Sequence, residues 1–378
     1  MRLKLKNTPE QIELVKAMGS KDVSVSREAS EAFAAFLGPV IQQVINQAST
    51  AGAIYQDASY DEDDHPSFPL DLYYDQPAGY ISTWSQSIAG GLPVSQDVAA
   101  TQELKIATYN IDSAVSVSRK YARKGRLDVV SKAVERMAQE VLVKQDRNAW
   151  AVVLKALGEG NTNSLGHLIA QPDSPADGTG FRVADLNAMM TRMRRINASF
   201  AGGTPDSAFS EGLTDLFVSP EIVEDIRAFA YQPMNTRGVP DSTESTAVPL
   251  PDSVRSEIYN NAGTSEIYGV NITEILELGV SKKYNVLFDQ FDSSIFGSGS
   301  RTSANTEIVV GVDGSKGSFI RAIAQNGDTG SSFNAIPDDQ YSARHDKVGF
   351  YGSLEAASYK HLRAHETVLD IVCRLLLE

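Results

Sequence analysis

Between Lys105 and Gly158 the hydrophobic pattern changes its period once, and this change constrains the fold more than any other feature. Apolar residues first alternate with polar ones, which is the period of a half-buried strand. They then recur every three or four positions, which is the period of an amphipathic helix. The sequence therefore predicts a strand over 105–117, followed by a long helix over 127–157 that Gly158 and Gly160 end.

The rest of the chain predicts a mixed α+β protein. A Thr8-Pro9 pair is typical of a helix N-terminus, and Pro39 is expected to kink the helix that follows. By the same periodicities we expect helices over 8–19, 26–45, 184–200 and 219–229, and strands over 216–218, 267–278, 284–288 and 308–312. A Gly/Pro/Asp/Ser-rich stretch over 161–180 is a plausible domain boundary.

Length and charge limit the class of protein. The 378 residues are enough for two domains or one elaborated domain. A formal net charge of -14 argues against broad, non-specific nucleic-acid binding. The single cysteine, Cys373, excludes an intrachain disulfide and fits a reducing compartment. With no signal-peptide pattern and no apolar run of membrane-spanning length, we expect a soluble protein made in the cytosol.

The stretch from Ala51 to Thr101 is rich in proline and aromatic residues. Its aromatic content argues against plain disorder, and its length without core periodicity favours a functional segment. Aromatic side chains that project on such a segment need a partner surface. We therefore expect Tyr80, Trp84 and Leu92 to contact a neighbouring subunit.

His361 and His365 are the strongest candidates for metal chemistry. They share a predicted helix face at i and i+4 and lie beside Glu366, which could suggest zinc. The metalloprotease motif places Glu directly after the first His, where this chain has Leu362. Two solvated histidines are the simpler interpretation. A metal-dependent hydrolase that uses the three residues is the alternative from the enzyme class.

Other candidate sites also have simpler explanations. The acidic run Asp61–Asp64 could hold a divalent cation but lacks the calcium-loop spacing, which favours a solvated loop. Gly311–Gly314 is better explained as a hairpin turn than as a phosphate loop. Cys373 lies in an apolar run and is expected to be a buried thiol. We therefore predict no catalytic, cofactor-binding or metal site, and a protein that is not an enzyme.

A basic cluster precedes the long helix. Arg119, Arg123 and Arg126 belong to it, together with Lys120 and Lys124. In such an acidic chain these residues could pair with carboxylates of a neighbouring subunit, contact nucleic acid, or have no specific role. Ion pairing between subunits is the interpretation we favour.

The order of these elements resembles the major capsid protein family of tailed bacteriophages, whose fold is shared with encapsulins. Phe217-Val218-Ser219-Pro220-Glu221 is similar to a strand-then-helix phrase of the family's axial domain, and Ile272-Thr273-Glu274-Ile275 to a later strand. The resemblance implies an N-terminal arm over 1–50 and an extended loop region over 51–104. It further implies a peripheral domain with the spine helix over 105–180, an axial domain over 181–340, and a return to the peripheral domain over 341–378.

The resemblance also implies a function and partners. The chain is expected to assemble into hexamers and pentamers of an icosahedral virion shell in the host cytoplasm, around double-stranded DNA held without sequence-specific contacts. A portal protein, a separate scaffolding protein and a decoration protein are the other expected partners. The stretch from Asp61 to Leu104 contains no Lys, so the covalent crosslinking of some members is not expected. An encapsulin-like nanocompartment shell is the alternative within the same fold.

Overall fold

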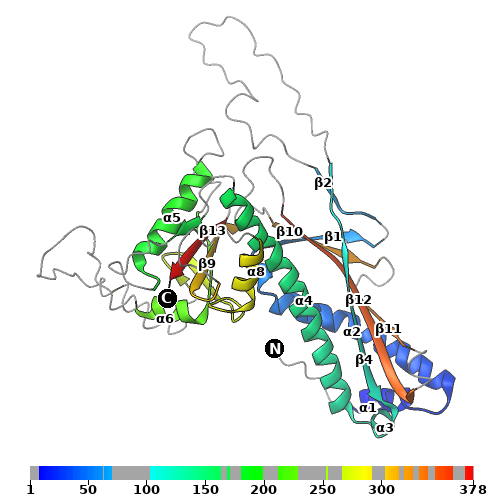
Figure 1. Cartoon of the computed structure of the whole chain (residues 1–378). Coiled ribbons are helices and arrows are strands. Elements are labelled where there is room, and N and C mark those ends of the chain that lie inside the picture. The colour runs from blue at the N-terminus through cyan, green and yellow to red at the C-terminus, as the bar shows by residue number, and fades with distance from the viewer. Residues whose placement is uncertain are drawn as a thin grey trace, which may run out of the picture. The chain divides into compact units, whose positions relative to one another are not determined.

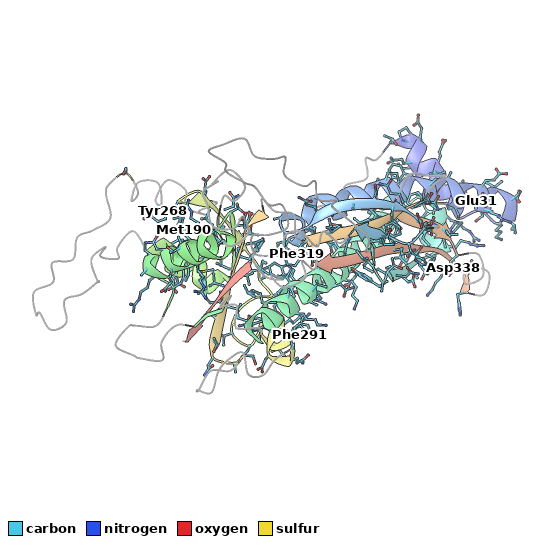
Figure 2. All side chains as sticks on the ribbon, turned by 90° about the horizontal axis from the view of Figure 1, so that it is seen from above. Glu31, Met190, Tyr268, Phe291, Phe319 and Asp338 are labelled. Carbon is cyan, nitrogen blue, oxygen red and sulfur yellow. The ribbon has the colours of Figure 1, made fainter. Side chains whose placement is uncertain are left out.

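The computed structural model describes residues 8–62, 64–69, 103–162, 168–170, 180–198, 212–228, 253, 266–291, 303–314, 319–326, 332–338, 345–360 and 371–377. The chain divides into two compact units (Figure 1). The first combines residues 1–68, 103–149 and 319–359, and the second combines 69–102, 150–318 and 360–378. Figure 2 shows their side chains, with Glu31 marking the first unit and Met190 the second. The predicted α+β class is confirmed.

Two helices open the first unit. Helix α1 (Pro9–Met18) begins at Thr8, whose hydroxyl accepts the Gln11 amide at 3.4 Å, as the Thr-Pro pair predicts. Helix α2 (Val23–Ala48) begins earlier than expected because Asp22 is its N-cap. It is assigned as one helix through Pro39. A 3-10 turn, η1 (Ala51–Ala53), follows.

A five-stranded sheet forms the centre of the first unit. Its strands are β1 (Gln56–Asp61), β4 (Tyr109–Ser118), β10 (Phe319–Gln325), β11 (Phe333–Pro337) and β12 (Lys347–Lys360). The order is β1-β10-β12-β11, and β4 also pairs with β12. β1 runs parallel to β10, whereas β4 and β11 run antiparallel to β12. The 14-residue strand β12 therefore has β4, β10 and β11 as its neighbours, whereas β1 reaches the sheet through β10.

The core of the first unit lies between this sheet and its helices. β4 alternates as predicted, with Ile111 and Val117 buried and the residues between them more exposed. Helix α3 (Arg119–Arg123) follows β4, and α4 (Leu127–Thr162) follows α3. One apolar cluster joins these elements, and its members include Met18, Phe33, Leu37, Ile41, Ile111, Val134, Met137, Val141, Phe333, Phe350 and Leu354. Residues of α4 from Trp150 onward belong to the second unit.

The second unit contains a six-stranded sheet in the order β5-β13-β9-β6-β8-β7. The strands are β5 (Leu168–Ala170), β6 (Asp215–Val218), β7 (Glu266–Ile267), β8 (Val270–Glu274), β9 (Thr306–Val312) and β13 (Ile371–Leu377). Its helices are α5 (Val183–Ala198), α6 (Pro220–Ala228) and α8 (Lys283–Phe291). Residues of α5, α6 and the sheet share one core, which includes Leu186, Met189, Met193, Leu216, Ile222, Ile226 and Val309.

Three predictions of local structure are wrong. The segment over 284–288 lies in helix α8, where Tyr284 and Phe288 are buried at i and i+4. Gly158 and Gly160 do not end α4, which continues to Thr162. Gly311–Gly314 is no hairpin turn, because β9 pairs with β13 and β6 whereas β10 belongs to the other sheet.

Candidate functional site

A short two-stranded ladder joins the two ends of the segment 70–102, called here the aromatic segment. Strand β2 (Ser67–Pro69) pairs with β3 (Glu103–Lys105). Just beyond the ladder, the Ile106 amide donates to the Pro66 carbonyl oxygen at 3.1 Å. The chain therefore leaves β2 and returns at β3, so that both ends of the segment 70–102 are held side by side. Tyr80, Trp84 and Leu92 lie outside the described residues, and their predicted contacts stay predictions.

Within residues 1–50, where the resemblance implies an N-terminal arm, several side chains belong to the core of the first unit. Val15, Met18, Phe33, Leu37 and Ile41 are at most 3% exposed, and all belong to the core of the first unit. Burial of apolar side chains at this level contributes roughly 1.5–3 kcal/mol per residue. Helices α1 and α2 are therefore integral parts of the first unit.

An apolar hollow nevertheless remains open between α1, α2 and the start of α4. It has a volume of about 120 Å³ and is lined by Gln11, Leu14, Phe33, Phe36 and Leu127. Phe36 is 42% exposed at its rim. Exposed aromatic and aliphatic side chains of this kind are typical of contact surfaces when they gather in one place.

The basic cluster divides into two groups. Arg123 Nε donates to the Gly19 carbonyl oxygen at 2.7 Å, so this side chain binds the C-terminal end of α1. The Nε atom of Arg119 lies 3.7 Å from Asp346 Oδ1. Arg126, in contrast, has an exposed side chain whose Nη1 lies 3.7 Å from exposed Asp128. All three predicted arginines thus have contacts within the unit, although that of Arg126 is long and exposed, and pairing between subunits stays a prediction.

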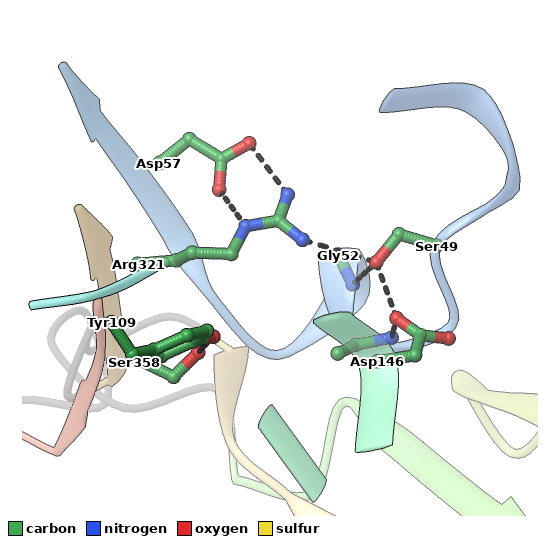
Figure 3. Close-up of polar contacts among 8 residues, drawn as sticks. Ser49, Gly52, Asp57, Tyr109, Asp146, Arg321 and Ser358 are labelled. Atoms are coloured by element: carbon green, nitrogen blue, oxygen red, sulfur yellow. Dashed lines mark hydrogen bonds and ion pairs between the residues drawn. The ribbon is translucent and has the colours of Figure 1, made fainter. Parts of the chain in front are cut away.

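A partly buried polar network joins β1, β10, α4 and the end of α2 (Figure 3). The guanidinium of Arg321 donates from Nε and Nη2 to Asp57 and from Nη1 to the Ser49 hydroxyl oxygen at 3.1 Å. Ser49 Oγ donates in turn to Asp146 Oδ1 at 2.7 Å. Asp146 also accepts from Thr50, through the backbone amide at 2.9 Å and the hydroxyl at 2.6 Å. Sequence periodicity could not identify this network because its members are far apart in the chain.

Tyr55 continues this network toward the body of α4. Its hydroxyl donates to the Ala149 carbonyl oxygen at 2.9 Å, and its ring packs edge-on against Phe319. Burial, with a smaller contribution from Tyr109, raises the pKa of the Tyr55 hydroxyl far above its ordinary value. Tyr55 is therefore a neutral hydrogen-bond donor with a structural role. We interpret the network as a structural connection and not as a catalytic site.

The candidates for metal chemistry have no counterpart in the part of the chain that the structure describes. His361, His365 and Glu366 lie outside it, as does Asp63 of the acidic run. Within the described ranges, no group of three His, Cys, Asp or Glu side chains could hold a metal ion. Cys373 lies on β13 opposite Val310 of β9, and its side chain is outside the description. None of the described helices combines the length and apolar character needed to cross a bilayer.

Comparison with known proteins gives similarity at the level of structure. No family model and no curated protein matches the sequence. A structure from Microbacterium phage Oxtober96 is similar with a TM-score of 0.48 and 15% identity, over 87% of this chain and 90% of that one.

Two further structures show the range of this similarity. The capsid structure of Cyanophage P-SCSP1u is similar with a TM-score of 0.48 and 10% identity, over 86% of this chain and 88% of that one. A virus-like particle from Pyrococcus furiosus is similar with a TM-score of 0.41 and 13% identity, over 90% and 97%. All three TM-scores lie below 0.5, so these similarities carry no argument for the function of this chain.

Proposed function

We propose that the chain is the major capsid protein of a tailed bacteriophage, the repeated structural subunit of an icosahedral shell around double-stranded DNA. The observation that carries the proposal is the β2–β3 ladder, which holds both ends of the aromatic segment 70–102. The ladder joins the two ends of a segment that contains three Tyr and one Trp, and this segment is proposed to contact another copy. Interfaces that depend on aromatic anchors of this kind are typical of stable assemblies.

Three further features support a structural role. The first unit combines a long helix with an extended sheet, and its described polar network is structural. Large apolar side chains are exposed on the same unit, including Phe36, Tyr121, Ile336 and Tyr351. The net charge of -14 disfavours tight attachment of packaged DNA to the wall.

The proposal includes partners and a place of assembly. Copies of the chain form hexamers and pentamers, with a portal protein at one vertex and a separate scaffolding protein during assembly in the host cytoplasm. A decoration protein is a further expected partner. DNA is enclosed without sequence-specific contacts.

Electron microscopy and light scattering of the purified protein, alone and with the candidate scaffolding protein, test the proposal. The expected result is closed shells, or hexamers and pentamers that convert to shells. A protein that stays monomeric at high concentration under both conditions contradicts it. Shells that contain a protein cargo and come from a locus without portal and packaging genes support the nanocompartment alternative instead.

A further inference from the structure

The outer face of the first unit's sheet turns away from the apolar core. On β4, the buried Ile111 and Val117 face the helices, whereas Asn110 and Asp112 are exposed. Cross-strand partners share a face, so Glu355 lies beside Asn110, and Ser353 beside Asp112. Tyr351 is 39% exposed on the same face, and its hydroxyl donates to Asp112 Oδ1 at 2.6 Å. This face is exposed and mainly polar, unlike the side covered by α2 and α4, although Ile336 lies beside Tyr351 as an exposed apolar side chain.

A polar cleft crosses this outer face where β1 and β10 end. It has a volume of about 50 Å³, enough for a side-chain head group or a few waters. Its lining consists of Glu62, Asn110, Ala324, Asn326, Ser332, Asn334, Ser353 and Glu355. Two of these described lining residues are carboxylates and none is cationic, so the cleft has a net negative charge.

The pKa of the Tyr60 hydroxyl reflects the negative charge of the cleft. It pairs with Ala324 across β1 and β10 and so shares the face that the cleft occupies. Burial raises the pKa of its hydroxyl, and the nearby charges of Glu355 and Glu62 raise this pKa further. A cation placed in the cleft reduces this repulsion among negative groups, whereas an anion increases it.

Exposed cations lie at the other end of the same strand. β4 begins at Tyr109, next to the cleft, and ends at Ser118, where α3 and the basic cluster follow (Figure 1). Eight residues of strand separate Asn110 from this end, a distance of about 27 Å. Lys124 is exposed, and the side chain of Arg126 is 61% exposed with only a long contact to an exposed carboxylate.

We propose that the cleft of one copy receives Arg126, with Lys124 beside it, from a neighbouring copy of the chain. This inference rests on the proposed function, because it assumes that copies assemble. A guanidinium presents five N–H donors in a plane, and the cleft offers carboxylate, amide and hydroxyl acceptors around a head-group-sized space. The acidic run that includes Glu62 is therefore one side of a contact between copies, and the basic cluster is the other.

The cleft and Arg126 lie at opposite ends of β4 on one copy, so the contact joins different surfaces of two copies. Repeated head-to-tail contacts of this type generate a closed ring when the rotation between copies allows closure. A two-fold symmetric pair would instead use both patches twice, with each cleft receiving Arg126 of the other copy. Under the proposed function the ring is the arrangement we expect, and the number of copies in the isolated assembly distinguishes it from the pair.

Charge reversal on each side, followed by reversal of both sides in one chain, tests the contact. We expect Glu62→Lys with Glu355→Lys to raise the protein concentration needed for assembly by about tenfold or more, because like charges then face each other. Lys124→Glu with Arg126→Glu should have an effect of the same size. The chain with all four reversals should recover most of the wild-type assembly, since the pairing is restored with opposite sign. Glu13→Lys with Glu28→Lys makes the same charge change at two exposed sites of α1 and α2, and should leave assembly near wild type.

Thermal unfolding of each variant separates an effect on folding from an effect on assembly. If the fourfold reversal assembles no better than either pair alone while remaining folded, the proposed contact is wrong. It is also wrong if the cleft variant assembles like wild type. A wild-type protein that never assembles contradicts the proposed function itself, and the two failures are thereby distinguished.

Discussion

Arg321 on β10 and Asp57 on β1 form a bidentate ion pair between two parallel strands that are 264 residues apart in the sequence. The Arg321 Nε atom lies 2.6 Å from Asp57 Oδ1, and Nη2 lies 2.8 Å from Oδ2. The Arg321 side chain is 2% exposed, whereas that of Asp57 is 47% exposed. The arginine therefore depends on this carboxylate and on Ser49 for its charge to be tolerated within the fold.

Removal of Asp57 should destabilise the first unit. In Asp57→Ala the guanidinium keeps its buried position but loses its carboxylate. We expect the free energy of unfolding to fall by roughly 2–3 kcal/mol, below the ~3–5 kcal/mol of a fully buried pair because Asp57 is half exposed. Urea unfolding followed by circular dichroism measures this loss. The exposed pair of Arg27 and Glu31 is the matched control, and Glu31→Ala should cost less than about 1 kcal/mol. Equal losses in the two variants contradict the argument.

Gly352 on β12 is required for close packing against two side chains. A Cβ atom added at this position would overlap with Phe333 Cζ and Met137 Cε. Gly352→Ala should therefore lower the unfolding free energy by about 1–3 kcal/mol through overpacking. At Gly52 the nearest atom to an added Cβ is Ser49 Cβ at 3.6 Å, so Gly52→Ala should be nearly neutral. The packing argument fails if the two alanine variants have the same melting temperature.

Trp150 anchors the core of the second unit. Its ring stacks on Tyr284 at a centroid distance of 5.6 Å and meets Phe217 edge-on at 5.2 Å. Trp150→Ala should cost about 3–5 kcal/mol of unfolding free energy, and Trp150→Phe distinctly less because an aromatic ring remains. Val143→Ala on the same helix removes a partly exposed side chain and serves as the control. A loss no larger than that of the valine variant overturns this role.

Trp84 should act on assembly rather than on folding. If it anchors the segment 70–102 to a neighbouring subunit, Trp84→Ala lowers the stability of shells or oligomers by an amount typical of an interface anchor, about 2 kcal/mol or more. The melting temperature of the dissociated subunit should change little. Light scattering measures the first quantity and circular dichroism the second. A subunit that unfolds as readily as the shell dissociates identifies Trp84 as a core residue instead.

Asp225 should make the stability of the second unit depend on pH. Burial raises the pKa of its carboxyl, the Phe181 amide that donates to Oδ2 at 2.7 Å partly opposes this, and Glu224 adds to the rise. The folded state thus holds the proton more tightly than the unfolded chain does. Stability from this group is present at low pH and is lost as pH rises through the folded pKa.

The variant Asp225→Asn isolates this effect. It keeps an oxygen acceptor for the Phe181 amide but cannot ionise. Relative to wild type, it should be more stable at neutral pH. The difference should shrink as pH falls through the raised folded pKa and level off below the ordinary Asp value of 3.8. Urea titrations at several pH values measure the difference. A difference that is constant across this range shows that ionisation of Asp225 does not contribute.

Elements with a long, regular period could be predicted from the sequence. β4 and α4 follow their hydrophobic patterns because each buries one face against the same core. The segment around Tyr284 was predicted as a strand because five residues of mixed polarity fit both periods. Its helical form depends on packing of Tyr284 and Phe288, which the local pattern does not reveal.

Contacts between distant parts of the chain could not be predicted in the same way. The pairing of Asp57 with Arg321 requires that β1 and β10 be parallel neighbours, and no local pattern specifies that topology. The cleft around Glu62 and Glu355 has the same origin, since β12 must first bring Glu355 beside Asn110. The sequence shows which residue types are present, but it does not show that these particular residues lie together in the fold.

The position of β12 in the first sheet has a consequence for synthesis of the protein. β4 ends at Ser118, yet its partner β12 begins only at Lys347. During translation, β4 leaves the ribosome long before its partner exists, while residues 150–318 are made for the other unit. The edge of β4 therefore stays unpaired until β12 has been synthesised. This delay slows folding and makes the nascent chain prone to aggregation. A completed outer face appears only after β12 has been synthesised, so shorter nascent chains cannot offer the cleft to one another.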